Sequence, residues 1–189
     1  MMMQIFHITQ GAIDLITEFE GFSHTIYMCP ALKPTVGFGH VVRYNDYFDI
    51  FKGSFIKRTS LLLHKKCQGR KETNSLLGKI FPKLITRQNA ITLLKHDLGF
   101  AVKILQKNVI IELNTRQIGA LLSFIYNIGG HAFEKSTLLR KLNQSDILGA
   151  ADEFERWIYA GKKPLKGLMV RRKKEKEFFL SVKSTNVKT

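Results

Sequence analysis

Three residues near the start of the chain combine side-chain types that could carry out acid chemistry. They are Glu20, Cys29 and Thr35, separated by eight and then five residues. A carboxylic acid can protonate a leaving oxygen when burial beside apolar groups raises its pKa. Glu20 follows Phe19 at the end of an apolar-periodic stretch and precedes a glycine, so we expect the chain to leave a helix there. Its carboxyl would then lie at a junction between two lobes, as the proton donor that glycosidic hydrolysis requires.

Each of the three residues also has a plainer interpretation. Glu20 could be a solvated carboxylate at a helix end, Cys29 a small buried hydrophobe, and Thr35 an ordinary strand residue. A thiol with an ordinary pKa of about 8.5 is mostly neutral at pH 7, so it stabilises charge less well than a carboxylate does. At average residue frequencies this triplet arises by chance in roughly a few per cent of chains of this length, so the spacing alone decides little.

The surrounding elements are predicted to be a small sheet followed by helices. Residues 9–19 repeat apolar side chains at helical spacing after a capping residue, Thr9. Residues 20–42 mix Gly, Pro, aromatic and β-branched residues, which is typical of turns and short strands. Later helices are predicted after four caps: Thr86 (to 107), Asn114 or Thr115 (to 128), Ser136 (to 142), and Ser145 or Asp146 (to 159). A last helix without an evident cap is predicted over 168–182. This order predicts an α+β fold with a small β-containing N-terminal lobe and a larger helical C-terminal lobe.

A basic insertion is predicted between the sheet and the helical lobe. Residues 43–85 hold several aromatic residues and then a run rich in Lys, Arg, Ser and Thr, without a clear period. The run includes Cys67, the one cysteine besides Cys29. A bridge between the two is possible, but reduced thiols are the expectation for a protein made in the cytoplasm.

Several other residues are expected to be structural. His40 follows a Gly-x-Gly turn, where it can bond backbone groups, and Trp157 and Tyr159 are expected in the core. The run RRKKEKEFF at 171–179 predicts a solvated helix face that could also favour an anionic wall. The six histidines show no ligand spacing, so no metal site is predicted.

The charge of the chain is unusual for an otherwise ordinary globular composition. Thirty Lys and Arg face fifteen Asp and Glu, a formal net charge of +15, and the basic residues gather at 52–71 and 162–176. Such a charge attracts nucleic acid, an anionic lipid surface or an acidic wall polymer, but no nucleic-acid-binding signature is present. No apolar run reaches the roughly 20 residues of a membrane span, and residues 1–11 do not resemble a signal peptide. We therefore expect synthesis in the cytoplasm.

Further motifs surround the triplet. Five stretches carry them: FEGF at 19–22, TVGFGH at 35–40, ALLSFIYNIG at 120–129, AFEKSTLLRKLN at 132–143 and the segment 150–172. In this order they resemble the phage-type lysozymes (endolysins), glycoside hydrolase family 24, whose signature is Glu, eight residues, Asp or Cys, five residues, Thr. Glu20, Cys29 and Thr35 match that signature, and the resemblance covers about residues 9–42 and 86–182.

The resemblance implies a fold and an activity. The fold would be a single lysozyme-like domain over 9–182, with lobes at 9–85 and 86–182, a substrate cleft between them, and a tail over 183–189. The activity would be hydrolysis of the β-1,4 linkage between N-acetylmuramic acid and N-acetylglucosamine in peptidoglycan, by a monomer without a cofactor. A holin or an equivalent hole would release it to the wall. The alternative is a peptidoglycan-binding protein of the same fold, weakened as an enzyme by Cys29 or by the insertion.

The resemblance also implies residue roles. Glu20 would be the general acid, Thr35 would help to hold the attacking water, and Cys29 stands where many members have Asp. Arg171 would face the catalytic carboxyl and hold it in place. The resemblance also implies supporting positions along the saccharide cleft: Asn127, Phe133, Ser136 and Thr137.

Overall fold

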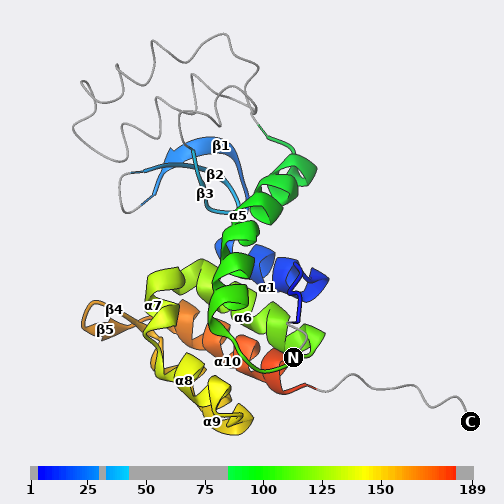
Figure 1. Cartoon of the computed structure of the whole chain (residues 1–189). Coiled ribbons are helices and arrows are strands. Elements are labelled where there is room, and N and C mark those ends of the chain that lie inside the picture. The colour runs from blue at the N-terminus through cyan, green and yellow to red at the C-terminus, as the bar shows by residue number, and fades with distance from the viewer. Residues whose placement is uncertain (1–3, 30–32, 43–84, 182–189) are drawn as a thin grey trace, which may run out of the picture. The chain divides into compact units, whose positions relative to one another are not determined.

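The computed structural model describes residues 4–29, 33–42 and 85–181 (Figure 1). Most of the predicted insertion, with Cys67, and the predicted tail lie outside these residues. The contacts divide the chain into two units, one of Met1–Phe19 with Lys95–Thr189 and the other of Glu20–Leu94. Each unit is described below by itself.

The smaller unit is built on a three-stranded antiparallel sheet. Its strands are β1 (Ser23–Met28), β2 (Pro34–Gly37) and β3 (His40–Val41), with β2 in the centre. The ring of Phe38 packs against that of Phe22 at 5.3 Å, and the Arg87 guanidinium lies 5.1 Å from the Phe38 centroid. This unit therefore has its own apolar contacts, and the small sheet predicted over 20–42 is confirmed.

The larger unit is helical. Figure 1 shows its elements in chain order: α1 (Gln10–Glu20), α5 (Arg87–Asn108), α6 (Thr115–Ile128), α7 (Gly130–Glu134), α8 (Thr137–Asn143), α9 (Ile147–Glu153), a 3₁₀ turn (Phe154–Arg156), β4 (Tyr159–Ala160), β5 (Lys163–Pro164) and α10 (Lys166–Leu180). Glu20, at the end of α1, and the first turns of α5 belong to the smaller unit. Helix α6 is buried over 117–125 and packs along α10. The ring centroids of Phe124 on α6 and Phe154 on the 3₁₀ turn lie 4.9 Å apart, so the two elements share one core.

The predicted helix caps are confirmed. The hydroxyl of Thr9 accepts the Ala12 N–H at 3.1 Å, and that of Thr86 accepts the Asn89 N–H at 3.2 Å. Asn114 caps α6 with its carbonyl oxygen. Ser136 and Asp146 likewise cap α8 and α9. The backbone N–H groups of the first helical turn have no carbonyl partner within the helix, and these side-chain oxygens accept hydrogen bonds from them. The starts of the helices could therefore be predicted from the capping residues.

Two expectations for the helical unit are wrong. The helix predicted to reach Tyr159 ends at Arg156, and a two-stranded hairpin of β4 and β5 follows it. Tyr159 lies on this hairpin and is 58% exposed, whereas Trp157 packs on Phe124 at 5.6 Å as expected for a core residue. Residues 10–19 group with the helical unit by their contacts, while the predicted lobe boundaries at 9–85 and 86–182 stay a prediction.

Two kinds of feature are absent from the part of the chain described here. No described helix is long and apolar enough to cross a membrane. No group of three or more His, Cys, Asp or Glu side chains within residues 4–29, 33–42 and 85–181 could hold a metal ion.

Candidate active site

Glu20 is the last residue of α1, and its side chain is half-buried. The next residue, Gly21, has a φ of 69°, the left-handed conformation in which helices commonly end. A side chain would be strained at this φ, so glycine allows the chain to turn from α1 toward β1, which starts at Ser23. Glu20 therefore stands at the helix end that the sequence predicted, three residues before β1. Its position at a junction between lobes stays a prediction.

Cys29 and Thr35 lie on the hairpin that joins β1 to β2. The backbone N–H of Cys29 donates to the carbonyl oxygen of Lys33 at 3.0 Å, and the Thr35 hydroxyl donates to the same oxygen, also at 3.0 Å. Thr35 pairs with Tyr27 across the ladder, one residue before the end of β1. One backbone acceptor thus holds together two of the three predicted catalytic residues.

The Thr35 hydroxyl has a defined polarity. A hydroxyl carries one proton and two lone pairs, and the proton of Thr35 is directed at the Lys33 oxygen. Its lone pairs are what remain for a further hydrogen bond. Thr35 is 2% exposed and lies on the central strand. An oxygen of this polarity can hold a water molecule by accepting a hydrogen bond from it, which leaves the lone pairs of the water available for attack.

Cys29 is half-buried. Because Cys67 lies outside the described residues, the expectation that both cysteines are reduced stays a prediction. Cys29 directly follows β1, and its backbone N–H bond to Lys33 holds the main chain at this position. Its catalytic role stays a prediction.

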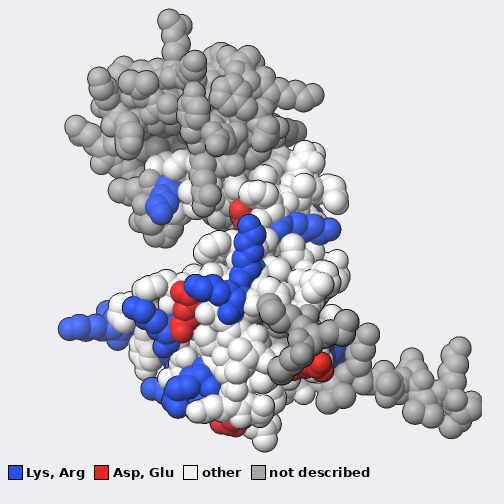
Figure 2. Space-filling view, in the orientation of Figure 1, with Lys and Arg blue, Asp and Glu red and all other residues white. Residues whose placement is uncertain are grey.

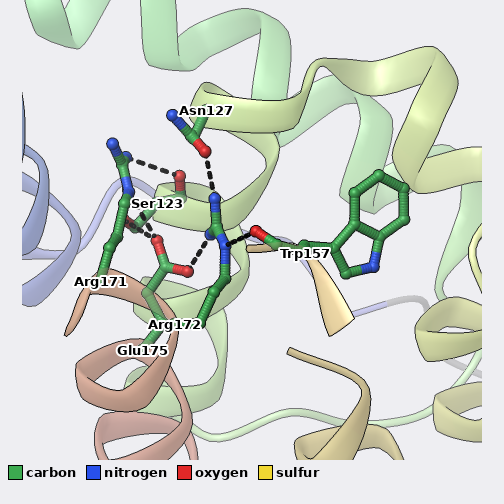
Figure 3. Close-up of polar contacts among 6 residues, drawn as sticks. All are labelled: Ser123, Asn127, Trp157, Arg171, Arg172 and Glu175. Atoms are coloured by element: carbon green, nitrogen blue, oxygen red, sulfur yellow. Dashed lines mark hydrogen bonds and ion pairs between the residues drawn. The ribbon is translucent and has the colours of Figure 1, made fainter. Parts of the chain in front are cut away.

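Arg171 belongs to a buried cluster of charged side chains on α10 (Figure 3). Its Nε donates to Glu175 at 3.0 Å, and one Nη donates to the carbonyl oxygen of Ser123 at 3.2 Å. Ser123 in turn donates its hydroxyl proton to Glu175 at 2.7 Å, and Arg172 forms a second ion pair with the same carboxylate. Two guanidinium groups therefore share one buried carboxylate, and this cluster locks α10 onto α6.

Two basic residues of α10 also hold the end of α1. The Arg171 guanidinium lies 5.6 Å from the centre of the Phe19 ring, and the Lys174 ammonium lies 5.8 Å from it. Lys174 also forms an ion pair with Glu18. Positive charge is favourable there because the C-terminal end of a helix carries the negative end of its dipole. Arg171 thus fixes the residue directly before Glu20, while the expectation that it faces the Glu20 carboxyl stays a prediction.

The four remaining predicted residues lie at the end of α6 and along α7 and α8. Asn127 is exposed and accepts a hydrogen bond from Arg172. Phe133 is 0% exposed, and the buried Ser136 hydroxyl accepts the Leu139 N–H at 3.0 Å, so both hold their segment together. Thr137, the first residue of α8, is half-buried. Contact of this segment with a saccharide stays a prediction.

Three members of the buried cluster were not predicted as functional residues: Ser123, Arg172 and Glu175. The run 171–179 was interpreted as a solvated face, yet Arg171, Arg172 and Glu175 are at most 3% exposed. That interpretation is wrong for these residues because each charge finds a partner, the condition under which charged side chains are buried. The available signal was the spacing, since Glu175 stands three and four residues after the two arginines.

Positive charge is prominent on the surface as well. Figure 2 shows Lys and Arg side chains outnumbering acidic ones over the viewed face, including the region of β4 and β5. The hairpin and the start of α10 contribute Lys162, Lys163 and Lys166, all exposed. This part of the predicted basic stretch at 162–176 is therefore displayed to solvent, in contrast to the two buried arginines. The stretch at 52–71 lies outside the described residues.

Comparisons with known proteins agree with this arrangement. The SAR-endolysin of Enterobacteria phage PA-2 is 40% identical over 114 residues, which is 60% of this chain and 67% of the relative. An endolysin of Acyrthosiphon pisum secondary endosymbiont phage 1 is 31% identical over 179 residues, 93% of this chain and 99% of the relative. Among solved structures, the muramidase domain of SpmX from Asticaccaulis excentricus is 26% identical, with a TM-score of 0.68 over 93% of this chain and 99% of that one. A P22 lysozyme variant is 30% identical, with the same TM-score and the same coverage.

These similarities establish the fold as the lysozyme-like α+β fold predicted from the motifs. The phage lysozyme family model matches residues 17–175. The chain belongs to the phage lysozyme family, and the predicted enzyme class, a lysozyme, is confirmed. These comparisons do not favour the alternative, a peptidoglycan-binding protein of the same fold that is weakened as an enzyme.

Proposed function

We propose that this chain is a muramidase that cleaves the β-1,4 linkage between N-acetylmuramic acid and N-acetylglucosamine, with Glu20 as the general acid. Peptidoglycan as the substrate follows from membership of the phage lysozyme family. Glu20 protonates the glycosidic oxygen as the bond to the anomeric carbon breaks. A water molecule held by the Thr35 hydroxyl attacks the anomeric carbon from the opposite face of the sugar, and the proton that it loses passes to solvent.

The observation that carries this proposal is the shared bond to the Lys33 carbonyl oxygen. Because this acceptor takes the Thr35 proton, the Thr35 oxygen can only accept a hydrogen bond from a water. The same acceptor fixes Cys29 beside it through the backbone. Cys29 then orients the water or the backbone and need not supply a full negative charge. Arg171 supports the acid by holding Phe19, the residue before it.

The main test is the loss of turbidity of a bacterial cell-wall suspension. We expect Glu20→Gln to lower the rate by at least about 100-fold, since a positioned acid contributes roughly 10²–10⁴. Glu18→Gln is the matched control: this exposed carboxyl lies two residues earlier on the same helix, and its loss removes the same charge. Equal rates for wild type and Glu20→Gln would refute the assignment of the acid. A native chain that binds walls without clearing them would favour the binding alternative.

The hairpin residues are tested by paired substitutions. Thr35→Val keeps the shape and removes the lone pairs, so we expect a rate loss of about 100-fold, whereas Thr35→Ser keeps the hydroxyl and most of the rate. Circular dichroism must show both variants folded, because Thr35 is buried. If Cys29→Ser retained full activity at every pH, Cys29 would have no catalytic role.

We further propose that the protein acts on the wall as a monomer after passing a holin or an equivalent hole. The wall as target follows from the peptidoglycan substrate, and the exposed lysines at 162, 163 and 166 suit an anionic polymer. Co-expression with and without a holin, followed by culture turbidity, tests the release. Lysis that does not depend on the holin would refute that step.

A further inference from the structure

Helix α10 has charged side chains on its buried side and apolar side chains on its exposed side. The buried side carries Arg171, Arg172 and Glu175, which pair with one another (Figure 3). On the exposed side, Met169 is 48% exposed and Val170 is 53% exposed. A surface helix ordinarily buries its apolar side and exposes its charges. The inversion leaves these apolar side chains uncovered, although the buried side of the helix is fully used.

The exposed residues at the start of α10 gather on one face. Helical residues three, four and seven positions apart lie on the same side of a helix. The residues at this spacing, together with the residue that precedes the helix, are all exposed and are called the outer face of α10: Leu165, Lys166, Met169, Val170 and Lys173. Apolar side chains that gather in this way, with charged ones beside them, mark an interaction surface.

The hairpin of β4 and β5 adds positive charge beside the outer face of α10. Lys162 stands in its turn and Lys163 begins β5, and both are exposed. The hairpin leads directly into α10 (Figure 1), and the Leu165 N–H donates to the Ile158 carbonyl oxygen at 2.9 Å. Residues 156–174 include no Asp or Glu. This part of the chain therefore contributes only positive charge to the surface.

Basic and apolar side chains in combination fit an anionic lipid surface. The lysine ammonium groups reach the lipid phosphates, while the apolar side chains enter the boundary between headgroups and acyl chains. A wall polymer or a nucleic acid would be attracted by the lysines alone, and Met169 and Val170 would stay in water. A second copy of this chain is disfavoured because a two-fold interface would bring the same lysines against one another.

We propose that the outer face of α10 and the β4–β5 hairpin form a binding surface for anionic phospholipid bilayers. The protein lies on the bilayer through this surface and does not cross it. The inference does not rest on the proposed cleavage of peptidoglycan, because no residue of the surface takes part in that reaction. It assigns the positive charge of this segment to attachment at a membrane.

Co-sedimentation with lipid vesicles at roughly 0.1 M salt tests the charged part of the surface. We expect the full chain to bind vesicles of equal parts phosphatidylglycerol and phosphatidylcholine, and to bind vesicles of phosphatidylcholine alone at least about tenfold more weakly. Each lysine near an anionic bilayer contributes roughly fivefold to the affinity. A triple variant should therefore bind the anionic vesicles about 100-fold more weakly: Lys162→Gln, Lys163→Gln and Lys166→Gln.

The matched control removes three exposed lysines from other parts of the helical unit: Lys95→Gln, Lys103→Gln and Lys135→Gln. Its net charge equals that of the first triple variant, but we expect an affinity within about fivefold of the wild type, since charges far from the bilayer are screened. Equal losses for the two triple variants would show that net charge alone attracts the protein, and would overturn the inference. Absence of wild-type binding to the anionic vesicles would overturn it as well.

Substitution of the apolar residues separates a lipid surface from a site for soluble polyanions. The double variant Met169→Ser, Val170→Ser should bind the anionic vesicles about tenfold more weakly, because less apolar area leaves water on binding. Ile110→Ser, Leu148→Ser is the control, since these side chains are 67% and 71% exposed elsewhere in the helical unit, and it should bind like the wild type. If the apolar variant also binds like the wild type, the lysines form a site for polyanions such as a wall polymer, and the inference is wrong.

Fluorescence reports the contact itself. With the wild-type signal subtracted, the emission of Val170→Trp should shift to shorter wavelengths when the anionic vesicles are added, whereas that of Leu148→Trp should not. Bound protein without a shift for Val170→Trp, or with equal shifts for both variants, would overturn the inference. Circular dichroism checks that each variant is folded, as expected at exposed positions. If a multiple variant does not fold, the comparison of the two tryptophan variants decides.

Discussion

Replacing Glu175 by glutamine tests how much the buried charge cluster stabilises the helical unit. The carboxylate is fully buried, accepts from Arg171 at 3.0 Å and from Ser123 at 2.7 Å, and pairs with Arg172. Glutamine keeps the shape but is neutral, so two buried guanidinium groups lose a shared counter-charge. Removing one partner of a buried ion pair costs about 3–5 kcal/mol. In a chain of this length each kcal/mol lowers Tm by about 2–4 °C, so we expect a fall of roughly 6–20 °C.

Thermal unfolding followed by circular dichroism at pH 7 measures this effect. The matched control is Glu177→Gln, two residues along the same helix, where the carboxyl is 62% exposed and lies 4.0 Å from Lys173. An exposed pair contributes about 0–1 kcal/mol, so the control should melt within about 4 °C of the wild type. If Glu175→Gln melted as little below the wild type as the control does, the cluster would not stabilise the fold as argued.

Two further predictions concern stability. The hydrogen bond from Lys141 holds the pKa of the buried Glu153 below its ordinary value. The ionised carboxylate therefore stabilises the fold at every pH above the pKa that Glu153 has in the unfolded chain. This contribution is lost as the pH falls through the pKa of Glu153 in the folded protein. Glu153→Gln should therefore melt below the wild type at pH 7, and the gap in Tm should close on acidification; a gap that stayed constant would argue against this linkage. Gly37 has a φ of 64°, and an added Cβ would lie 2.9 Å from the Cβ of Ala90, so Gly37→Ala should cost about 1–3 kcal/mol. Urea unfolding measures this loss of stability, with Gly167→Ala as the control because a Cβ added there meets open space. Equal unfolding midpoints for the two variants would contradict the prediction.

Much of the fold could be predicted because its signals are local. Caps such as Thr9 and Asn114 act within three residues of their own position, and apolar periodicity marks the buried face of α6. The hairpin that ties Cys29 to Thr35 was also predictable as turns and short strands. The helical lobe therefore matches the sequence analysis in most of its elements.

The remaining features depend on contacts between distant segments. Strands β4 and β5 have two residues each, which is too short for a period to show. The burial of Arg172 depends on Glu175 on its own helix and also on Asn127, 45 residues away. The pairing of these charges is visible only in the folded core. From the sequence alone, a run of lysines and arginines therefore predicts a solvated helix face.

The Lys33 carbonyl has a consequence for mutational scanning. The atom that joins Cys29 to Thr35 belongs to the main chain, so it is present whatever side chain stands at position 33. The Lys33 side chain is exposed, and the next residue, Pro34, has no N–H to compete for neighbouring acceptors. An alanine scan would therefore pass over this position without effect, although the peptide group there organises the site. Only exchanging the atom itself, for example a thioamide in place of the Lys33 amide by chemical ligation, would expose its contribution.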